Sequence, residues 1–493
     1  MAFDDDDEWL TQQQRLAFTT GAAGDLAGAI SQSRKLLDYQ LRVLGPDHPD
    51  TLTTRNNLAF WTGEAGDLPG AINEFHELLD SRSRVLGPDH PDTLITRNNL
   101  ASFTGEAGDL AGASRQFREL LDAQLRVLGP DHPKTLSTRS NLASLTASAG
   151  DLAGASGQFR ELLDAQLRVL GPDHPDTLIT RSNLASFTAS AGDLAEAISQ
   201  FRELLDAQLR VLGPDHPDTL ITRNNLASLT AWAGDPAGGI SQFRELLDDR
   251  LRVLGPDHPD TLITRSNLAS TTREAGDPAG GISQFRELLD DRLRVLGPDH
   301  PDTLITRSNL ASTTREAGDP AEAISQFREL LDARLRVLGP DHPDTLITRS
   351  NLASTTGEAG DPAGAISQLR ELLDDQLRVL GPDHPDTLGT RSHLAFWTGE
   401  VGDPAGAISQ LRELLDDQLR VLGPDHPETL RTRNNLAFWT GEVGDPAGAI
   451  SQLRELLDDQ LRVLGPDHPD TLVVRSNLAS LREGIGRDQD GTG

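Results

Sequence analysis

The string Gly-Pro-Asp-His-Pro at residues 171–175 opens a 42-residue unit, residues 171–212, that decides the fold. The chain repeats this unit, and successive copies are spaced by 42 residues without an insertion or deletion. Self-similarity at a fixed period of this length indicates a solenoid of stacked units instead of several globular domains. The eleven copies of the string begin at Gly45, Gly87, Gly129, Gly171, Gly213, Gly255, Gly297, Gly339, Gly381, Gly423 and Gly465.

Each unit is predicted to form two helices joined by glycine turns. The first helix is expected over residues 175–191, because proline suits a first helical turn and Asp173 or His174 can cap it. Gly192 can take the left-handed conformation that ends such a helix. Asp193 is then the expected cap of a second helix, which runs to the end of the unit.

The two helices carry apolar faces of different width. On the second helix the apolar residues recur at steps of three and four, which predicts a wide buried stripe. Neither helix can bury its face alone, so the unit is expected to be stable only when it is stacked on its neighbours. The stripe comprises Leu194, Ala197, Ile198, Phe201, Leu204, Leu205, Leu209 and Leu212, and the smaller face comprises Leu178, Arg181, Leu184, Ala185 and Thr188.

The solenoid is predicted to cover residues 9–484. It begins with a degenerate unit, 9–44, in which Trp9, Leu10, Leu16 and Ala17 take first-helix positions. Ten full units follow over 45–464, and a single helix in 465–484 is expected to cover the last apolar face. The acidic residues 1–8 and the polar tail 485–493 are expected to be disordered.

The pattern resembles the tetratricopeptide repeat, in the 42-residue form found in kinesin light chains and in bacterial tandem arrays. The resemblance rests on Asn183-Leu184-Ala185, Gly192-Asp193-Leu194, Ala197, Phe201 and the string at 171–175. It implies an all-α fold, an α-α superhelix in which antiparallel helix pairs form a right-handed solenoid. Arg181 stands where the family usually has an apolar residue, so it is expected to need a carboxylate partner such as Glu203.

In this family the first helices line the concave groove, so the resemblance places one asparagine of each unit there. A carboxamide both donates and accepts, and can therefore pair with the backbone of an extended peptide. The alternative is that it hydrogen-bonds the neighbouring repeat and fixes the stacking angle. The residues at this position are Asn57, Asn99, Asn141, Asn183, Asn225, Asn267, Asn309, Asn351, His393, Asn435 and Asn477.

Aromatic pairs distinguish a few units from the others. Phe60-Trp61, Phe396-Trp397 and Phe438-Trp439 replace pairs that begin with serine elsewhere. Aromatic residues and arginine beside polar anchors are typical of a binding hot spot, so residues 381–442 are the candidate contact site. The alternative is that each tryptophan only packs in the wall of the groove. The candidate residues here are His393, Phe396, Trp397, Arg431, Asn434, Asn435, Phe438 and Trp439.

Composition argues against several classes of protein. The chain has no cysteine and a formal net charge of −31. This charge disfavours binding to nucleic acid and to anionic membranes. It is compatible with a basic partner, although solubility alone explains it. Without a basic leader or a long apolar stretch, a cytoplasmic location is the default.

The sequence offers no catalytic or cofactor motif. Each Asp-His turn has one imidazole beside capping carboxylates, which do not converge as metal ligands must. We therefore expect a non-catalytic scaffold that binds a protein or peptide in its groove, without a cofactor or metal. The alternative is a sensor module that works with a separate nucleotide-binding switch protein. Oligomeric state is open.

Overall fold

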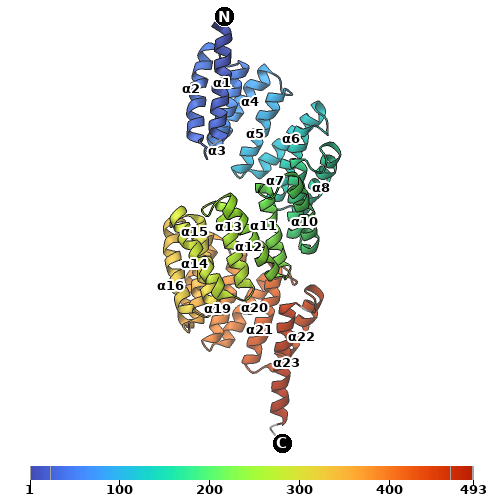
Figure 1. Ribbon diagram of the computed structural model, residues 1–493. Helices are drawn as coiled ribbons and strands as arrows, with labels where there is room; N and C mark the ends of the chain where they lie inside the picture. Colours follow the sequence, from blue (N-terminus) through green and yellow to red (C-terminus); the bar gives the residue numbers. More distant parts are fainter. Residues whose placement is uncertain (1, 23, 467, 491–493) are drawn as a thin grey trace. The chain divides into compact units, whose positions relative to one another are not determined.

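The structure is a computed structural model that describes residues 2–22, 24–466 and 468–490, with the side chains of residues 10, 12–22, 24–466 and 468–482. These residues form twenty-three α-helices and no strand (Figure 1). The chain divides into two compact units, Met1–Asp235 and Pro236–Gly493. Within each unit consecutive helices pack against each other, and so do first helices of neighbouring repeats. The prediction of an all-α solenoid of antiparallel helix pairs is therefore confirmed.

The first unit contains helices α1 to α11, drawn from blue to green in Figure 1. Its first helices are α1 (Ala2–Ala22), α3 (Pro49–Glu64), α5 (Pro91–Glu106), α7 (Pro133–Ser148), α9 (Pro175–Ser190) and α11 (Pro217–Trp232). Its second helices are α2 (Leu26–Val43), α4 (Leu68–Val85), α6 (Leu110–Val127), α8 (Leu152–Val169) and α10 (Leu194–Val211).

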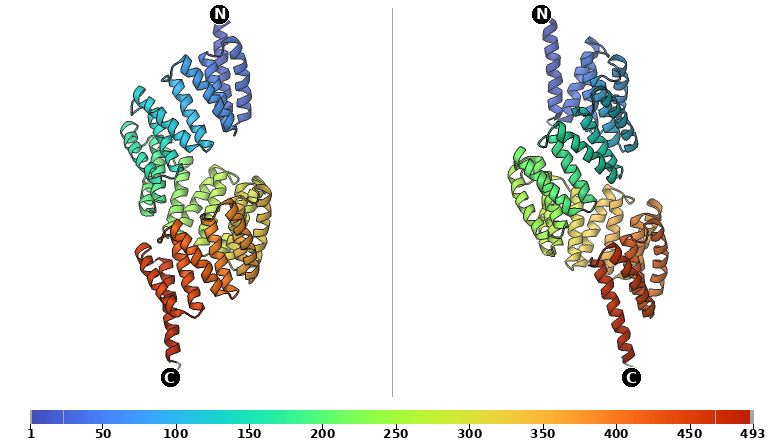
Figure 2. Two further views of the ribbon diagram at one scale, coloured as in Figure 1. Left: turned by 180° about the vertical axis from the view of Figure 1, so that it is seen from behind. Right: turned by 90° about the vertical axis from the view of Figure 1, so that its right-hand side faces the viewer.

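The second unit contains helices α12 to α23, and the two further views in Figure 2 show how its helix pairs stack. Its first helices are α13 (Pro259–Glu274), α15 (Pro301–Glu316), α17 (Pro343–Glu358), α19 (Pro385–Glu400), α21 (Pro427–Glu442) and α23 (Pro469–Asp490). Its second helices are α12 (Pro236–Val253), α14 (Pro278–Val295), α16 (Pro320–Val337), α18 (Pro362–Val379), α20 (Pro404–Val421) and α22 (Pro446–Val463).

The turns of the repeat follow the predicted chemistry. His174 is the cap of α9, and its Nδ1 accepts a hydrogen bond from the backbone N–H of Asp176 at 3.2 Å. Asp173, the other candidate, instead pairs with Arg210 at the end of the same repeat, at 3.1 Å. Gly192 has a φ of 89°, which an L-residue rarely adopts, so only glycine ends α9 without strain. Nδ1 of the turn histidine is thus already engaged in capping the helix.

The apolar stripe of the second helix is narrower than predicted at its end. Ala197, Phe201 and Leu204 are fully buried, but Leu209 is 40% exposed. Gln208, one residue earlier, is buried in its place. The prediction for Leu209 is wrong because the helix face that meets the next repeat shifts by one residue in the last turn. The hydrophobic pattern therefore predicted burial of Leu209, although the fold buries the polar Gln208 instead.

The arginine of the first helix has the carboxylate that the sequence requires. Arg181 lies 3.6 Å from Glu203. In later repeats an aspartate takes over, as in the 2.7 Å pair between Arg349 and Asp375. That aspartate stands where the earlier repeat has Ala207, so the shorter pair depends on a residue that only some repeats carry.

The ends of the chain are helical where they are described. α1 begins at Ala2 and α23 ends at Asp490, so helix enters the two segments predicted to be disordered. The limits of the solenoid stay a prediction. In the degenerate unit Leu10 and Ala17 are buried, but Leu16 is exposed, and the side chain of Trp9 lies outside the described residues. None of the described helices has a stretch apolar enough to span a membrane.

Candidate binding surface on the first helices

The repeated asparagines lie half-buried on the first helices, and two of them contact the preceding repeat. Asn141 donates from Nδ2 to Oδ1 of Asn98 in the preceding repeat at 3.5 Å, and Asn477 donates to Asn434 at 3.2 Å. These two contacts match the stacking alternative for this position. A half-buried carboxamide keeps further capacity for hydrogen bonds, so peptide binding at the other asparagines stays a prediction.

The aromatic pairs of residues 381–442 separate into buried and exposed members. Trp439 is 5% exposed and packs against Gly399 of the preceding repeat, where an added Cβ would lie 2.4 Å from its ring. Trp397 contacts Gly357 in the same way. Phe396 and Phe438 are 37% and 46% exposed, and their rings each lie about 5 Å from the neighbouring tryptophan ring. Of these four residues Trp439 is buried, Trp397 is half-buried and the two phenylalanines are exposed.

A cavity of about 380 Å³ opens beside these residues, between α17, α18, α19 and α21. It lies at the position of Gly389, where six other repeats have isoleucine and where an added Cβ would meet no atom within 4 Å. The volume falls within the range of small-ligand pockets, about 300–1,000 Å³. The residues that line it are Ile347, Ser350, Asn351, Gln376, Pro385, Asp386, Gly389, Thr390, His393, Glu428 and Arg431.

Three predicted site residues line this cavity: Asn351, His393 and Arg431. His393 replaces the repeated asparagine, and its buried Nδ1 has no hydrogen-bond partner among the described residues. Burial, together with the positive charges of Arg431 and Arg315, lowers the pKa of His393, so its neutral form is favoured. Arg431 is half-exposed and pairs with Glu428 one helical turn earlier. Asn434 lines a smaller neighbouring pocket of about 50 Å³ that also contains Arg431 and Gln460.

Sequence reasoning missed a buried polar position near the end of every second helix. It holds Arg82 in one repeat and Gln124 in the next, and its members are almost fully buried. The residue that follows, Leu209 in the repeat of Gln208, drew the apolar prediction instead. This position holds only arginine or glutamine in an otherwise nearly constant segment, and that restriction was the available signal. Random drift at a solvated position rarely leaves only two large polar residues.

Comparison with known proteins identifies the repeat. The Tetratricopeptide repeat family matches residues 9–50 and 51–92 with one of its profiles. A second Tetratricopeptide repeat profile matches residues 98–167, 176–237, 218–290, 273–336, 322–377 and 386–460. No curated protein matches the chain.

Several solved structures are similar at low identity. A Podosopora anserina structure described as "kinesin light chain nearly identical TPR-like repeats" is 22% identical, covers 42% of this chain and 97% of its own, and has a TM-score of 0.37. BtubC (BKLC) from P. vanneervenii is 20% identical, covers 48% and 94%, and has a TM-score of 0.41. A tetratricopeptide repeat protein from Parabacteroides merdae ATCC 43184 is 15% identical, covers 62% and 98%, and has a TM-score of 0.42.

Proposed function

Because the chain belongs to the tetratricopeptide repeat family, whose repeats generally serve as protein-interaction scaffolds, we propose that it is a non-catalytic scaffold. It binds a protein or peptide on the first helices of its second unit, at residues 381–442. The cytoplasmic location remains the prediction of the sequence.

The observation that carries this proposal is where the repeats depart from one another. Phe396 and Phe438 stand where eight repeats have serine, yet both are exposed instead of filling the core. Each ring contacts the neighbouring tryptophan on one side, and more than a third of each phenylalanine stays exposed. Arg431 and the cavity at Gly389 lie on the same first helices, α19 and α21. Exposed aromatic residues beside an arginine and a pocket are typical of an interaction surface.

The test is photo-crosslinking at this surface. A photoreactive amino acid at position 396 should capture one partner in the native host, and the same group at Leu419 should not. Leu419 is the matched control because it is also an exposed apolar residue, on the second helix α20. The captured protein is then purified and its affinity measured for the wild-type chain and for Phe396→Ser/Phe438→Ser.

The double variant restores residues that other repeats carry, so it should remain folded. We expect it to bind the purified partner at least about tenfold more weakly, since two exposed aromatic anchors contribute roughly 1 kcal/mol or more. Equal affinity of the wild-type and variant chains would show that the binding surface lies elsewhere.

A further inference from the structure

One column of the second helices holds either glutamine or arginine, and this column points to the chemistry of the partner. Every member is at most 4% exposed. Burying such polar groups is unfavourable unless they are hydrogen-bonded. The members are Gln40, Arg82, Gln124, Gln166, Gln208, Arg250, Arg292, Arg334, Gln376, Gln418 and Gln460.

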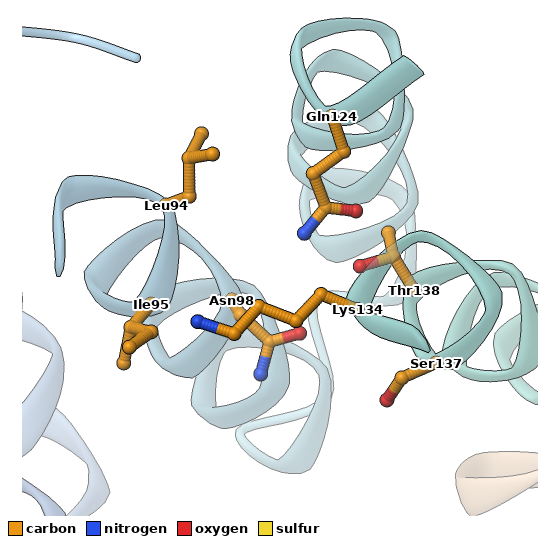
Figure 3. Close-up of a pocket in the computed structure, with 7 residues that line it drawn as sticks. All are labelled: Leu94, Ile95, Asn98, Gln124, Lys134, Ser137 and Thr138. Atoms are coloured by element: carbon orange, nitrogen blue, oxygen red, sulfur yellow. The ribbon is translucent and has the colours of Figure 1, made fainter. Parts of the chain in front are cut away.

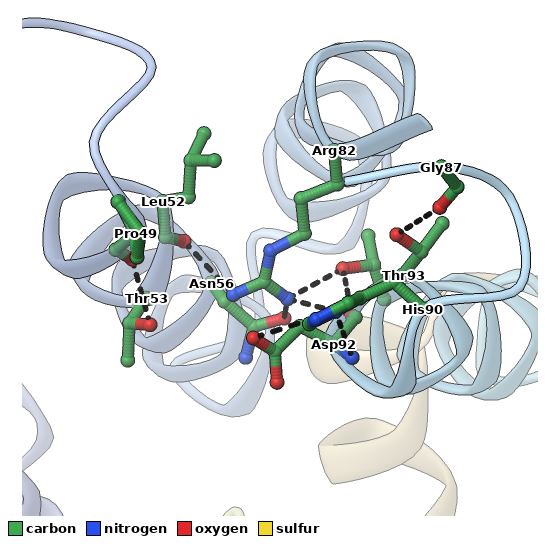
Figure 4. A network of polar contacts seen from close by, with 10 residues as sticks. Pro49, Leu52, Thr53, Asn56, Arg82, Gly87, His90, Asp92 and Thr93 are labelled. Carbon is green, nitrogen blue, oxygen red and sulfur yellow. Dashed lines mark hydrogen bonds and ion pairs between the residues drawn. The ribbon is translucent and has the colours of Figure 1, made fainter. Parts of the chain in front are cut away.

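In the arginine repeats the guanidinium fills a site at the junction with the next repeat. Figure 4 shows Arg82 reaching from α4 between α3 and α5. Its Nη1 donates to the backbone oxygen of Asp92 and to Oγ1 of Thr96, both at 2.8 Å, and its Nη2 donates to the backbone oxygen of Leu52 at 3.3 Å. Desolvation lowers the pKa of Arg82, partly offset by Asp92. The site therefore presents several oxygen acceptors to one planar cation.

The same geometry recurs in the second unit. Arg292 donates to the backbone oxygen of Asp302 at 2.8 Å and to Oγ1 of Thr306 at 2.6 Å. Arg334 donates to the backbone oxygen of Asp344 at 2.8 Å and to Thr348 at 2.7 Å. In each of these three arginine repeats the acceptors are a backbone oxygen and a threonine hydroxyl at the start of the following first helix.

In the glutamine repeats these acceptors lose their donor. Figure 3 shows Gln124 and Thr138 at a pocket of about 150 Å³, with the side chain of Lys134 extending across it. The buried Oε1 of Gln124 and Oγ1 of Thr138 have no hydrogen-bond partner in the described part of the chain. The same holds for Gln166 with Thr180. Among the described residues, the hydroxyl of this threonine is therefore satisfied beside Arg292 and Arg334 and left unpaired beside Gln124 and Gln166.

The pocket at Gln376 is larger than the one at Gln124 and offers more room to a partner. Gln376 is buried, its Oε1 has no hydrogen-bond partner among the residues that the structure describes, and it lines the cavity of about 380 Å³ together with Thr390. The cavity is open because Gly389 replaces isoleucine, and the carboxylate-bearing residues Asp386 and Glu428 also line it. Arg431 is the one arginine or lysine among the lining residues, and its positive charge would repel a bound cation. Its ion pair with Glu428 reduces this repulsion.

We propose that this pocket binds the guanidinium group of an arginine side chain supplied by the partner protein. The bound guanidinium takes the place that Arg292 and Arg334 fill from within the chain, with Gln376 and Thr390 as acceptors. Guanidinium suits the site better than an ammonium group because its planar donors match several converging oxygens. The inference rests on the proposed function and names the chemistry of the partner.

The test uses N-acetyl-arginine amide as the probe and the full chain in about 0.15 M salt, where long-range attraction to the acidic surface is screened. Saturation-transfer NMR measures binding, which we expect in the millimolar range for so small a ligand. N-acetyl-lysine amide has the same charge and N-acetyl-citrulline amide nearly the same shape. Both of these probes should bind at least about fivefold more weakly than the arginine probe. Equal binding of the lysine and arginine probes would overturn the proposal.

Two variants locate the site, and both use residues that other repeats carry at the same position. Gln376→Arg supplies an internal guanidinium and Gly389→Ile covers the entrance; each should remove binding of the arginine probe. Arg334→Gln/Ile347→Gly should create a second site and raise the number of probes bound. Circular dichroism confirms that each variant is folded. Unchanged binding in Gln376→Arg and Gly389→Ile, or no binding to the wild-type chain, would refute the proposal.

These outcomes can be told apart from failure of the proposed function. If the crosslinked partner depends on Phe396 and Phe438 but not on Gly389, the scaffold function holds and the arginine pocket does not. If the arginine probe binds and no partner is crosslinked at position 396, the pocket holds and the proposed surface does not.

Discussion

Two glycines on one helix should respond in opposite ways to the same substitution. Gly399 lies in the last turn of α19, and an added Cβ would stand 2.4 Å from Cζ2 and 2.5 Å from Cε2 of Trp439. Ordinary carbon contacts are about 3.5–4.0 Å, so the buried indole must move by roughly 1 Å. Gly389 lies in the same helix, and its added Cβ would meet nothing within 4 Å.

The expected magnitudes follow from these contacts. Overpacking typically destabilises by about 1–3 kcal/mol, and the gain in helix propensity is small near a helix end. Gly399→Ala should therefore destabilise its junction by about 1–2 kcal/mol. Gly389→Ala should stabilise α19 by about 0.5–1 kcal/mol, because only the propensity term acts. Gly399→Ala/Trp439→Thr should show coupling between its two substitutions, since threonine leaves room for the methyl group.

Hydrogen exchange is the suitable assay, because opening of a repeat array is local and a single global free energy is not defined for it. Peptides covering α21 should exchange about tenfold faster in Gly399→Ala, since 1.4 kcal/mol corresponds to one factor of ten. Peptides covering α19 should exchange more slowly in Gly389→Ala. If Gly399→Ala leaves exchange unchanged or slows it, the contact between Gly399 and Trp439 is not as tight as described.

The remaining predictions concern a buried cation, a histidine and a whole repeat. Arg292→Gln removes donors to Asp302 and Thr306 and should destabilise that junction by about 1–3 kcal/mol, measured by exchange in α15. Arg294→Gln removes only an exposed ion pair and should leave exchange in α15 nearly unchanged. His393 has a lowered pKa when folded, so stability is complete above its unfolded pKa of about 6.5 and falls as the pH drops below that value. His393→Asn should abolish this loss in α19, and an unchanged pH profile would exclude the histidine as its cause. Deletion of residues 297–338 removes one whole period and should leave a folded, shorter solenoid by circular dichroism; an unfolded chain would contradict nearest-neighbour stability.

Periodicity was sufficient to predict the fold, because it acts at every repeat. Local signals in the sequence determine the local geometry of each repeat. These signals are the string at 171–175, the glycines with positive φ, and caps such as Asp193. Leu209 and Gln208 show where this reasoning ends. Helical periodicity places both near the edge of the apolar stripe, and only the position of the next repeat determines which of them is buried.

The candidate site was less accessible to prediction for the same reason. Sequence comparison among the repeats located residues 381–442, because it reports where units differ. It could not separate Trp439 from Phe438, since one is buried and the other exposed only through contacts with the preceding repeat. The opening at Gly389 likewise depends on residues of the neighbouring repeats that surround this glycine. The sequence of a single unit does not contain those residues.

The same contacts show that a junction, not a repeat, is the unit within which residues vary together. Gly63 faces Phe103, Gly399 faces Trp439 and Gly105 faces Leu145, so a glycine in one repeat accompanies a large apolar residue in the next. In the central repeats the glycine position holds arginine instead. Arg315 extends to Glu358 of the following repeat at 2.8 Å, and the aromatic position there is Thr355.

Each arrangement fills its junction with a large side chain from one side only. A glycine beside a threonine would leave a void, and an arginine beside a tryptophan would overfill the same space. Nearly identical repeats are therefore not interchangeable. Their order is constrained by matching across such junctions. Phe396 takes part in this packing, since its ring lies 6.3 Å from that of Trp439 in the next repeat. An added Cβ at Gly389 would meet no atom within 4 Å, so variation at that position is not explained by packing at a junction.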